Sequence, residues 1–109
     1  MPETATILSI QSEVVRGHVG NAAARFALQR TGLDVWAVPT VLLSNHPGHG
    51  KVRGETLPAA QIGALVAGLD VHGWLKHCAG VISGYLGAAE QARAVADAVR
   101  LVKQANRQA

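Results

Sequence analysis

Apolar runs of strand length alternate with helical stretches along this chain, and this alternation predicts the fold. Ala5 to Ile10 is apolar and partly β-branched, which is typical of a buried strand. Ala22 to Thr31 is expected to form a helix that ends at Gly32, with Asn21 as its N-cap, before a second apolar strand from Leu33 to Val38. A strand, a helix and a strand in this order form a right-handed unit with parallel strands.

The middle of the chain has a different pattern. Pro39 and Thr40 interrupt the second strand, a short apolar run follows from Val41 to Leu43, and Ser44 to Lys51 is rich in turn formers. Val52 to Leu57 can return as a short strand, so the pattern predicts a hairpin or flap. A flap beside a ligand crevice would act as a lid.

The last half of the chain repeats the helix and strand pattern. Pro58 suits the first turn of a helix with Ile62, Leu65, Val66 and Leu69 on one face. A third parallel strand is expected at Ala79 to Ser83, and a final helix at about Ala88 to Asn106. The positions of this helix that should face the core are Ala92, Val95, Ala96, Val99 and Val102. Residues 1–109 therefore read as one α/β unit, a parallel sheet flanked by helices with a small β flap.

Composition narrows the class of protein. Hydrophobic residues make up 49% of the 109 residues and charged residues 16%, which favours a buried core over disorder. The net charge is +3, but Lys and Arg are scattered, which argues against a nucleic-acid partner. The single cysteine, Cys78, is expected to be buried and fits a reducing compartment. No apolar run approaches the roughly 18 residues of a membrane span, so we expect a cytoplasmic protein with no membrane partner.

Three polar loops should meet at one edge of the sheet, because each follows or joins strands at their carboxyl ends. They are Gln11 to Gly20, Ser44 to Gly50 and Gly84 to Gly87. They offer the hydroxyl of Ser12, the imidazoles of His46 and His49, and the ring and phenol of Tyr85. Apolar walls would come from Val19, Val41 and Leu43. This set suits a flat aromatic ligand with polar edges, although connections without any ligand fit the same pattern.

Other chemistries fit the same residues less well. His46 and His49 fall short of the three or four ligands that zinc needs, so no metal site is predicted. Ser12 lacks the base and the orienting acid of a nucleophilic serine, which favours a hydrogen-bonding role. The stretch from Gly17 to Gly20 lacks the spacing of a dinucleotide-binding loop. Trp36 and Trp74 are expected to be packing residues.

Three segments together carry a resemblance to a known family. They are ILSIQSEVVRGHVGNAAARFALQRTG, VLLSNHPGHGKVRGETLPAAQI and VISGYLGAAEQA, and they start at Ile7, Val41 and Val81. In this order and spacing the chain resembles the N-terminal part of the pyridoxal kinases, which belong to the ribokinase-like superfamily. The resemblance implies transfer of the ATP γ-phosphate to the 5′-hydroxyl of pyridoxal, pyridoxine or pyridoxamine. It also implies Mg²⁺ as a cofactor and a homodimer.

The resemblance also implies roles for individual residues. Ser12 matches the family serine that hydrogen-bonds the pyridine ring, and Tyr85 matches an aromatic residue near that ring. His46 and Pro47 match the flap segment over the substrate. The apolar walls are matched by Val19, Val41 and Leu43. The chain departs from the usual family residues at Glu13, Leu43, Pro47 and His49.

The resemblance places the phosphoryl-transfer machinery elsewhere. The family's ATP site and its glycine-rich segment with the catalytic aspartate are expected beyond Ala109, so no catalytic residue is assigned within this chain. We therefore expect the 109-residue chain to be inactive alone. Two alternatives stay open: a related kinase for a hydroxymethylpyrimidine, and a non-catalytic module that binds a small molecule.

Overall fold

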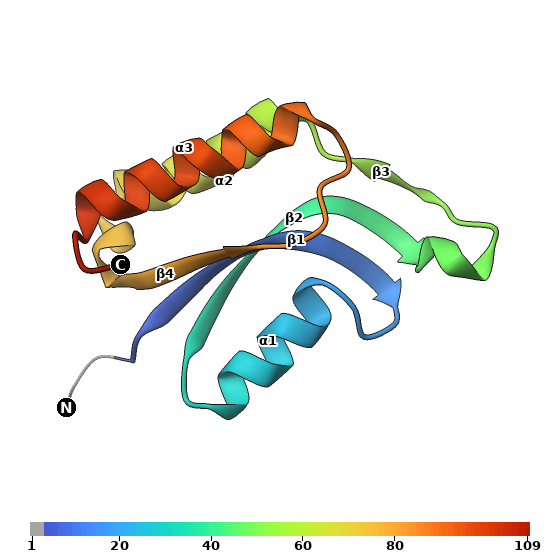
Figure 1. Ribbon diagram of the computed structural model, residues 1–109, viewed down its shortest axis with the longest axis horizontal. Helices are drawn as coiled ribbons and strands as arrows, with labels where there is room; N and C mark the ends of the chain where they lie inside the picture. Colours follow the sequence, from blue (N-terminus) through green and yellow to red (C-terminus); the bar gives the residue numbers. More distant parts are fainter. Residues whose placement is uncertain (1–3) are drawn as a thin grey trace.

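The computed structural model describes residues 4–109 as one four-stranded sheet with helices on both faces (Figure 1). Strands β1 (Thr6–Arg16), β2 (Asp34–Asn45), β3 (Gly54–Thr56) and β4 (Cys78–Ser83) lie in the order β3-β2-β1-β4. β1 pairs in parallel with β2 and β4, whereas β3 pairs antiparallel with β2. The sheet is therefore mixed, because the predicted flap adds one antiparallel strand at its edge.

The helices divide between the two faces of the sheet. Helix α1 (Asn21–Arg30) packs on β1 and β2 from one side, and helices α2 (Ala59–Val71) and α3 (Glu90–Ala105) lie together on the other side (Figure 1). Two short 3₁₀ turns, η1 (Pro47–His49) and η2 (Trp74–His77), follow β2 and α2. Within residues 4–109, none of the helices is both long enough and apolar enough to cross a membrane.

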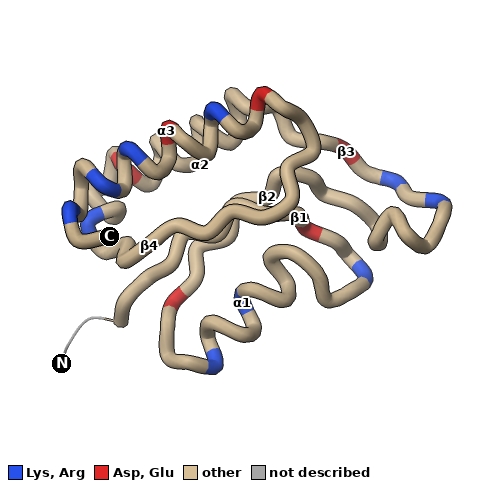
Figure 2. The backbone as a smooth tube through the Cα atoms, viewed as in Figure 1, with Lys and Arg blue, Asp and Glu red and all other residues tan. Residues whose placement is uncertain are grey.

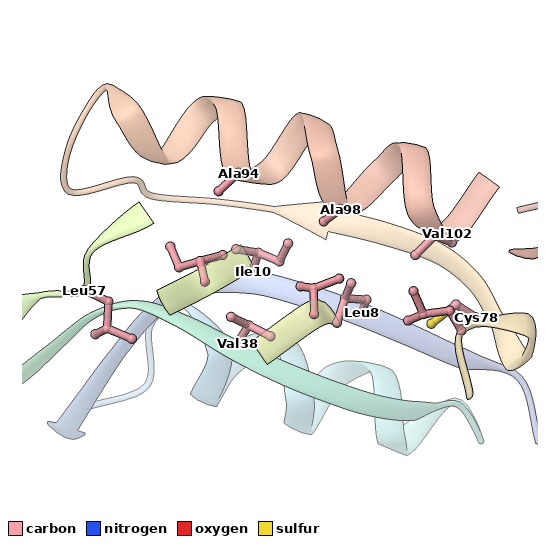
Figure 3. Packing of buried hydrophobic residues seen from close by; sticks show 11 residues of the cluster. Leu8, Ile10, Val38, Leu57, Cys78, Ala94, Ala98 and Val102 are labelled. Atoms are coloured by element: carbon pink, nitrogen blue, oxygen red, sulfur yellow. The ribbon is translucent and has the colours of Figure 1, made fainter. Parts of the chain in front are cut away.

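The core lies between the sheet and the α2–α3 layer (Figure 3). Leu8 and Ile10 of β1 are both fully buried there, because alternate residues of a strand point to the same face. The intervening Ser9 lies on the opposite face and hydrogen-bonds to α1. Other buried core residues are Val38, Leu57, Ile62, Val66, Leu75, Cys78, Ala94, Ala98 and Val102. Because side chains alternate between the two faces of a strand, β1 places Leu8 and Ile10 on the side of α3 and Ser9 on the side of α1.

The two central strands are longer than the sequence pattern predicts. β1 continues to Arg16, and β2 runs without a break through Pro39 and Thr40, so the interruption expected there is wrong. The register shifts at this point: Gln11 is opposite Pro39 and Glu13 is opposite Leu42. This bulge accommodates a proline, which has no N–H to give to the strand ladder. Residues expected in a loop after β1 are therefore strand residues beside a bulge.

The buried face of α3 is also different from the predicted one. Ala92, Ala96 and Val99 are exposed, while Val95 is half-buried and Val102 is buried as expected. The packed stripe begins at Gln91 and continues through Ala94 and Ala98 to Val102. The expected face is therefore displaced around the helix, because alanines occur both in the packed stripe and beside it.

Several large apolar residues of the helices are exposed, among them Leu65 of α2, which was expected to pack on the sheet. Phe26 of α1 is 68% exposed and lies near the Arg30 guanidinium, which is 6.0 Å from the centre of its ring. Trp36 packs partly against the core as expected, but Trp74 is half-exposed and stacks on His72. These side chains form apolar surface in the described part of the chain.

Candidate functional site: a pocket at the ends of β1 and β2

A pocket of about 430 Å³ lies between the ends of β1 and β2, the β1–α1 loop, the flap and the segment after β4. This volume falls in the range of small-molecule sites. Its lining residues are Gln11, Ser12, Val14, Val19, Gly20, Val41, Leu43, His46, Pro47 and Tyr85. The structure therefore brings together all of the residues that the sequence suggested for substrate binding: Ser12, Val19, Val41, Leu43, His46, Pro47 and Tyr85.

Ser12 lies opposite the bulge in β2 and packs closely against Gly20. Gly20 has φ +57°, and a Cβ built on it would overlap both the Oγ and the carbonyl oxygen of Ser12. A residue with a side chain would thus push the β1–α1 loop away from β1. The absence of a Cβ at Gly20 lets this loop, which carries Val19, close one side of the pocket.

A buried polar cluster holds the loop from beneath. The Oγ of Ser9 donates to Oδ1 of Asn21 at 2.7 Å, and Nε2 of Gln11 donates to the Ser9 Oγ at 2.9 Å. Nδ2 of Asn21 donates to the carbonyl oxygens of Gln11 at 3.3 Å and Val38 at 3.1 Å. The first residue of α1 is thereby tied to both β1 and β2.

Asn21 is consequently not the N-cap that the sequence suggested. Gly20 occupies the cap position, and Asn21 is the first helical residue, only 1% exposed. Its amide forms hydrogen bonds across the strands instead of capping the free N–H groups of α1. Among the described residues, every buried side-chain nitrogen and oxygen has a hydrogen-bond partner. The cluster is therefore a satisfied buried network that ties the start of α1 to the two strands beside the pocket.

The flap is held in shape by its own hydrogen bonds. The backbone N–H of Ser44 donates to the carbonyl oxygen of Arg53 at 2.7 Å, and Nδ2 of Asn45 donates to the carbonyl oxygens of His46 and Lys51, both at 3.1 Å. Pro47 is the first residue of η1, where a missing N–H leaves nothing unsatisfied. The segment that covers the pocket is thus an ordered turn.

His46 has a defined role in this turn. Its Nδ1 accepts a hydrogen bond from the backbone N–H of Gly48 at 2.9 Å. A neutral imidazole in this arrangement carries its proton on Nε2, so it offers a donor to a ligand. His49 lies with its ring edge toward His46, 6.2 Å between centroids, and does not line the pocket. Of the two imidazoles suggested by the sequence, His46 is the one at the site.

The remaining side of the pocket is formed by Tyr85, which lies between β4 and α3. Its carbonyl oxygen accepts a hydrogen bond from Oγ1 of Thr40 at 2.7 Å, while its side chain is 61% exposed. The backbone N–H of the preceding residue, Gly84, donates to the carbonyl oxygen of Ile10 at 3.1 Å. Both bonds anchor the main chain around Tyr85 to the central strands.

The lining suits binding more than bond breaking. None of the Asp and Glu residues between positions 4 and 109 lines the pocket, so the described lining offers no carboxylate that could act as a base. Within residues 4–109, no group of three or more His, Cys, Asp and Glu side chains lies close enough to hold a metal ion.

Cys78 lies away from the pocket, fully buried in the core as expected. Burial raises the pKa of its thiol from 9.0 to about 11. A thiol in this environment stays protonated at neutral pH, so Cys78 is a packing residue and not a nucleophile.

Three lining residues were not assigned to the site from the sequence. Val14 reaches the pocket because β1 is longer than predicted. Gln11 lies at the bulge, where its backbone and side chain join the polar cluster. A glycine directly before a helix suggests an unusual backbone conformation, so the sequence indicated that Gly20 is special. Its packing against Ser12 can be seen only in the folded structure.

Comparisons with known proteins place this pocket in context. No family model matches the chain. The chain is 53% identical over 106 residues to pyridoxal kinase PdxY of Pseudomonas aeruginosa, which covers 97% of this chain and 37% of that protein. The chain thus spans little more than a third of the length of the curated relatives that it matches.

Solved structures agree with the sequence relatives. Pyridoxal kinase from Leishmania donovani in complex with ADP and pyridoxamine superposes with a TM-score of 0.87 at 39% identity, covering 92% of this chain and 35% of that one. Pyridoxal kinase from Trypanosoma brucei gives a TM-score of 0.89 at 33% identity, covering 98% of this chain and 39% of that one.

The chain has the α/β fold of the corresponding segment of these two kinases, and its pocket lies at the edge of the sheet. Over the segment that it covers, the chain is a homologue of the pyridoxal kinases.

Proposed function

We propose that this chain is the N-terminal, substrate-side part of an ATP-dependent kinase that phosphorylates the 5′-hydroxyl of pyridoxal, pyridoxine and pyridoxamine. The proposal depends on one observation: all of the residues that the family resemblance assigns to the substrate line the same pocket. The Leishmania relative in complex with ADP and pyridoxamine supports both the ligand class and the use of ATP. The product from pyridoxal would be pyridoxal 5′-phosphate.

In this proposal the described residues bind and orient the pyridine ring. Val19 and Val41 provide apolar contact for the ring faces, while the Ser12 hydroxyl and the His46 Nε2–H provide polar contacts at its edge. Pro47 has neither an N–H nor a hydroxyl to offer, so direct hydrogen bonds from the flap are fewer than a threonine would allow. ATP, Mg²⁺ and the proton acceptor for the 5′-hydroxyl are assigned to parts of the protein outside residues 4–109.

The activity is tested on the protein that contains this chain. We expect ATP-dependent formation of pyridoxal 5′-phosphate, followed by absorbance, and weaker competition from a hydroxymethylpyrimidine than from pyridoxine. The proposal would be overturned if none of the three vitamers gave a phosphorylated product. Preferential phosphorylation of the hydroxymethylpyrimidine would replace it with the related pyrimidine kinase.

Ser12 provides the site-specific test. Ser12→Ala should weaken pyridoxal binding by about 0.5 to 1.5 kcal/mol through loss of one hydrogen bond, with ADP binding nearly unchanged. Thr31→Val is the matched control, because the Thr31 hydroxyl bonds to the carbonyl oxygen of Leu28 at the far end of α1. Calorimetric titration with pyridoxal and with ADP measures both effects. Unchanged pyridoxal affinity in Ser12→Ala would remove Ser12 from the binding site.

Location and assembly complete the proposal. A cytoplasmic protein fits the buried, protonated Cys78. Lys and Arg occur on α1, α3 and the β2–β3 connection, interspersed with Asp and Glu (Figure 2), which supports a small-molecule ligand over a nucleic acid. The homodimer stays a prediction, and light scattering of the complete protein measures it directly.

A further inference from the structure

Gln91, in the first turn of α3, is a fully buried amide that the binding proposal does not use. Its Nε2 donates to the carbonyl oxygens of Thr40 and Leu57, both at 2.8 Å, and its Oε1 accepts from the backbone N–H of Gly87 at 2.7 Å. Burial of an amide is unfavourable unless its donors and acceptor are satisfied. Gln91 meets this requirement entirely with main-chain atoms from three separate segments.

Two of these three segments adjoin residues that line the pocket, and the third follows the flap. Thr40 lies beside the bulge and directly precedes the wall residue Val41, and Leu57 follows the flap strand β3. Gly87 is two residues after Tyr85. In addition to the hydrogen bonds of Gln91, Oγ1 of Thr40 donates to the carbonyl oxygen of Tyr85 at 2.7 Å and so joins β2 to the segment after β4. The segment from Tyr85 to Gly87 is therefore connected to the base of the flap, at Thr40 and Leu57, directly at Tyr85 and through the Gln91 side chain at Gly87.

Close packing reinforces this arrangement. A Cβ built on Gly87 would come within 2.6 Å of a side-chain methyl of Val41 and within 2.9 Å of the Thr56 side chain. The main chain at Gly87 thus lies directly on one pocket wall and on β3. A change in the position of Gly87 or Tyr85 would alter the mouth of the pocket without any change in the residues that line it.

We propose that Gln91, together with Thr40, is a positioning residue that sets Tyr85 and the base of the flap for binding of a pyridine ring. Gln91 does not itself line the pocket. The inference rests on the proposed function, because it takes pyridoxal as the ligand. It predicts that affinity for the ring depends on a side chain in α3 that never touches it.

A purely structural amide at the other end of α3 gives a matched control. Nδ2 of Asn106 donates to the carbonyl oxygen of Cys78 at 2.8 Å, and neither residue lines the pocket. Loss of either amide should lower the stability of the fold. Only loss of Gln91 should change ligand binding.

The experiment uses Gln91→Met, Thr40→Val and Asn106→Leu in the protein that contains this chain, titrated with pyridoxal and with ADP. We expect the Kd for pyridoxal to rise about tenfold in Gln91→Met and about fivefold in Thr40→Val, as for loss of one or more hydrogen bonds. The Kd for ADP should change less than about twofold, and Asn106→Leu should leave both constants unchanged. Thr40→Val keeps the shape of the side chain, so it tests the inference even if Gln91→Met does not fold.

A double-mutant cycle distinguishes positioning from general destabilisation. If Thr40 acts through Tyr85, Thr40→Val should have little further effect on pyridoxal affinity in a Tyr85→Ala background. Full additivity of the two substitutions would overturn the inference, as would unchanged pyridoxal affinity in Thr40→Val and Gln91→Met variants that fold. A wild-type protein that binds ADP but no pyridoxal would overturn the proposed function and this inference together.

Discussion

At the scale of single residues, the pocket depends on Gly20, whose missing Cβ allows the β1–α1 loop to pack on Ser12. Gly20→Ala should destabilise the protein by about 1 to 3 kcal/mol, because it combines a left-handed φ with overlap on the Ser12 main chain. It should also weaken pyridoxal binding. Urea unfolding and calorimetric titration of the complete protein measure the two effects.

Gly68 in α2 is the matched control for this substitution. A Cβ on Gly68 meets nothing within 4 Å, and the residue is exposed in the middle of a helix. Gly68→Ala should therefore raise the free energy of unfolding by about 0.5 to 1 kcal/mol and leave binding unchanged. Equal effects of the two substitutions on binding would show that Gly20 has no special role at the pocket.

Cys78 predicts a dependence of stability on pH. Burial raises the pKa of its thiol from 9.0 to about 11 in the folded state. The unfolded chain loses this proton first, so the contribution to stability is complete below pH ~9 and falls as the pH rises toward ~11, by about 2 kcal/mol in all. The measurement compares urea unfolding of wild type and Cys78→Ala between these limits. The same pH slope in both proteins would contradict a buried, protonated thiol.

At the scale of elements, the apolar runs predicted the order of strands and helices because burial requires those runs. Leu8 and Ile10 face the core at the expected spacing, and the β2–β3 hairpin forms where turn residues cluster between two short apolar runs. The ends of the central strands were not predictable in the same way. Pro39 breaks a strand pattern in sequence, yet the bulge opposite Gln11 lets β2 continue through it.

Helix α3 shows a second limit of the pattern. The helix has one distinct apolar face, but Ala92 and Val99, which were expected to be buried, lie outside the packed stripe and are exposed. The face that packs also carries Gln91, whose hydrogen-bond partners include residues distant in the sequence. No local pattern contains that information, and a polar residue at the start of a helix usually indicates exposure.

At the scale of the whole molecule, parallel strands explain why the site residues were predictable. Ser12, His46 and Tyr85 are far apart in the chain. His46 and Tyr85 come just after the carboxyl ends of β2 and β4, Ser12 lies in the C-terminal half of β1, and the parallel strands bring these segments to one side of the sheet. What the topology did not predict is the support beneath them. The network of Ser9, Gln11 and Asn21 requires side chains from two strands and a helix to meet in the interior.

The central claim is that the pocket at this edge binds the pyridine ring of a vitamin B6 compound. Methyl-labelled NMR of the protein that contains this chain, titrated with pyridoxal, tests it most directly, because an aromatic ring shifts the resonances of the methyl groups that it contacts. We expect saturable shifts at Val19, Val41 and Leu43, which line the pocket, and none at Val99 and Val102, which line a hollow between β4 and α3. Saturation with pyridoxal that leaves Val19, Val41 and Leu43 unshifted would contradict the account.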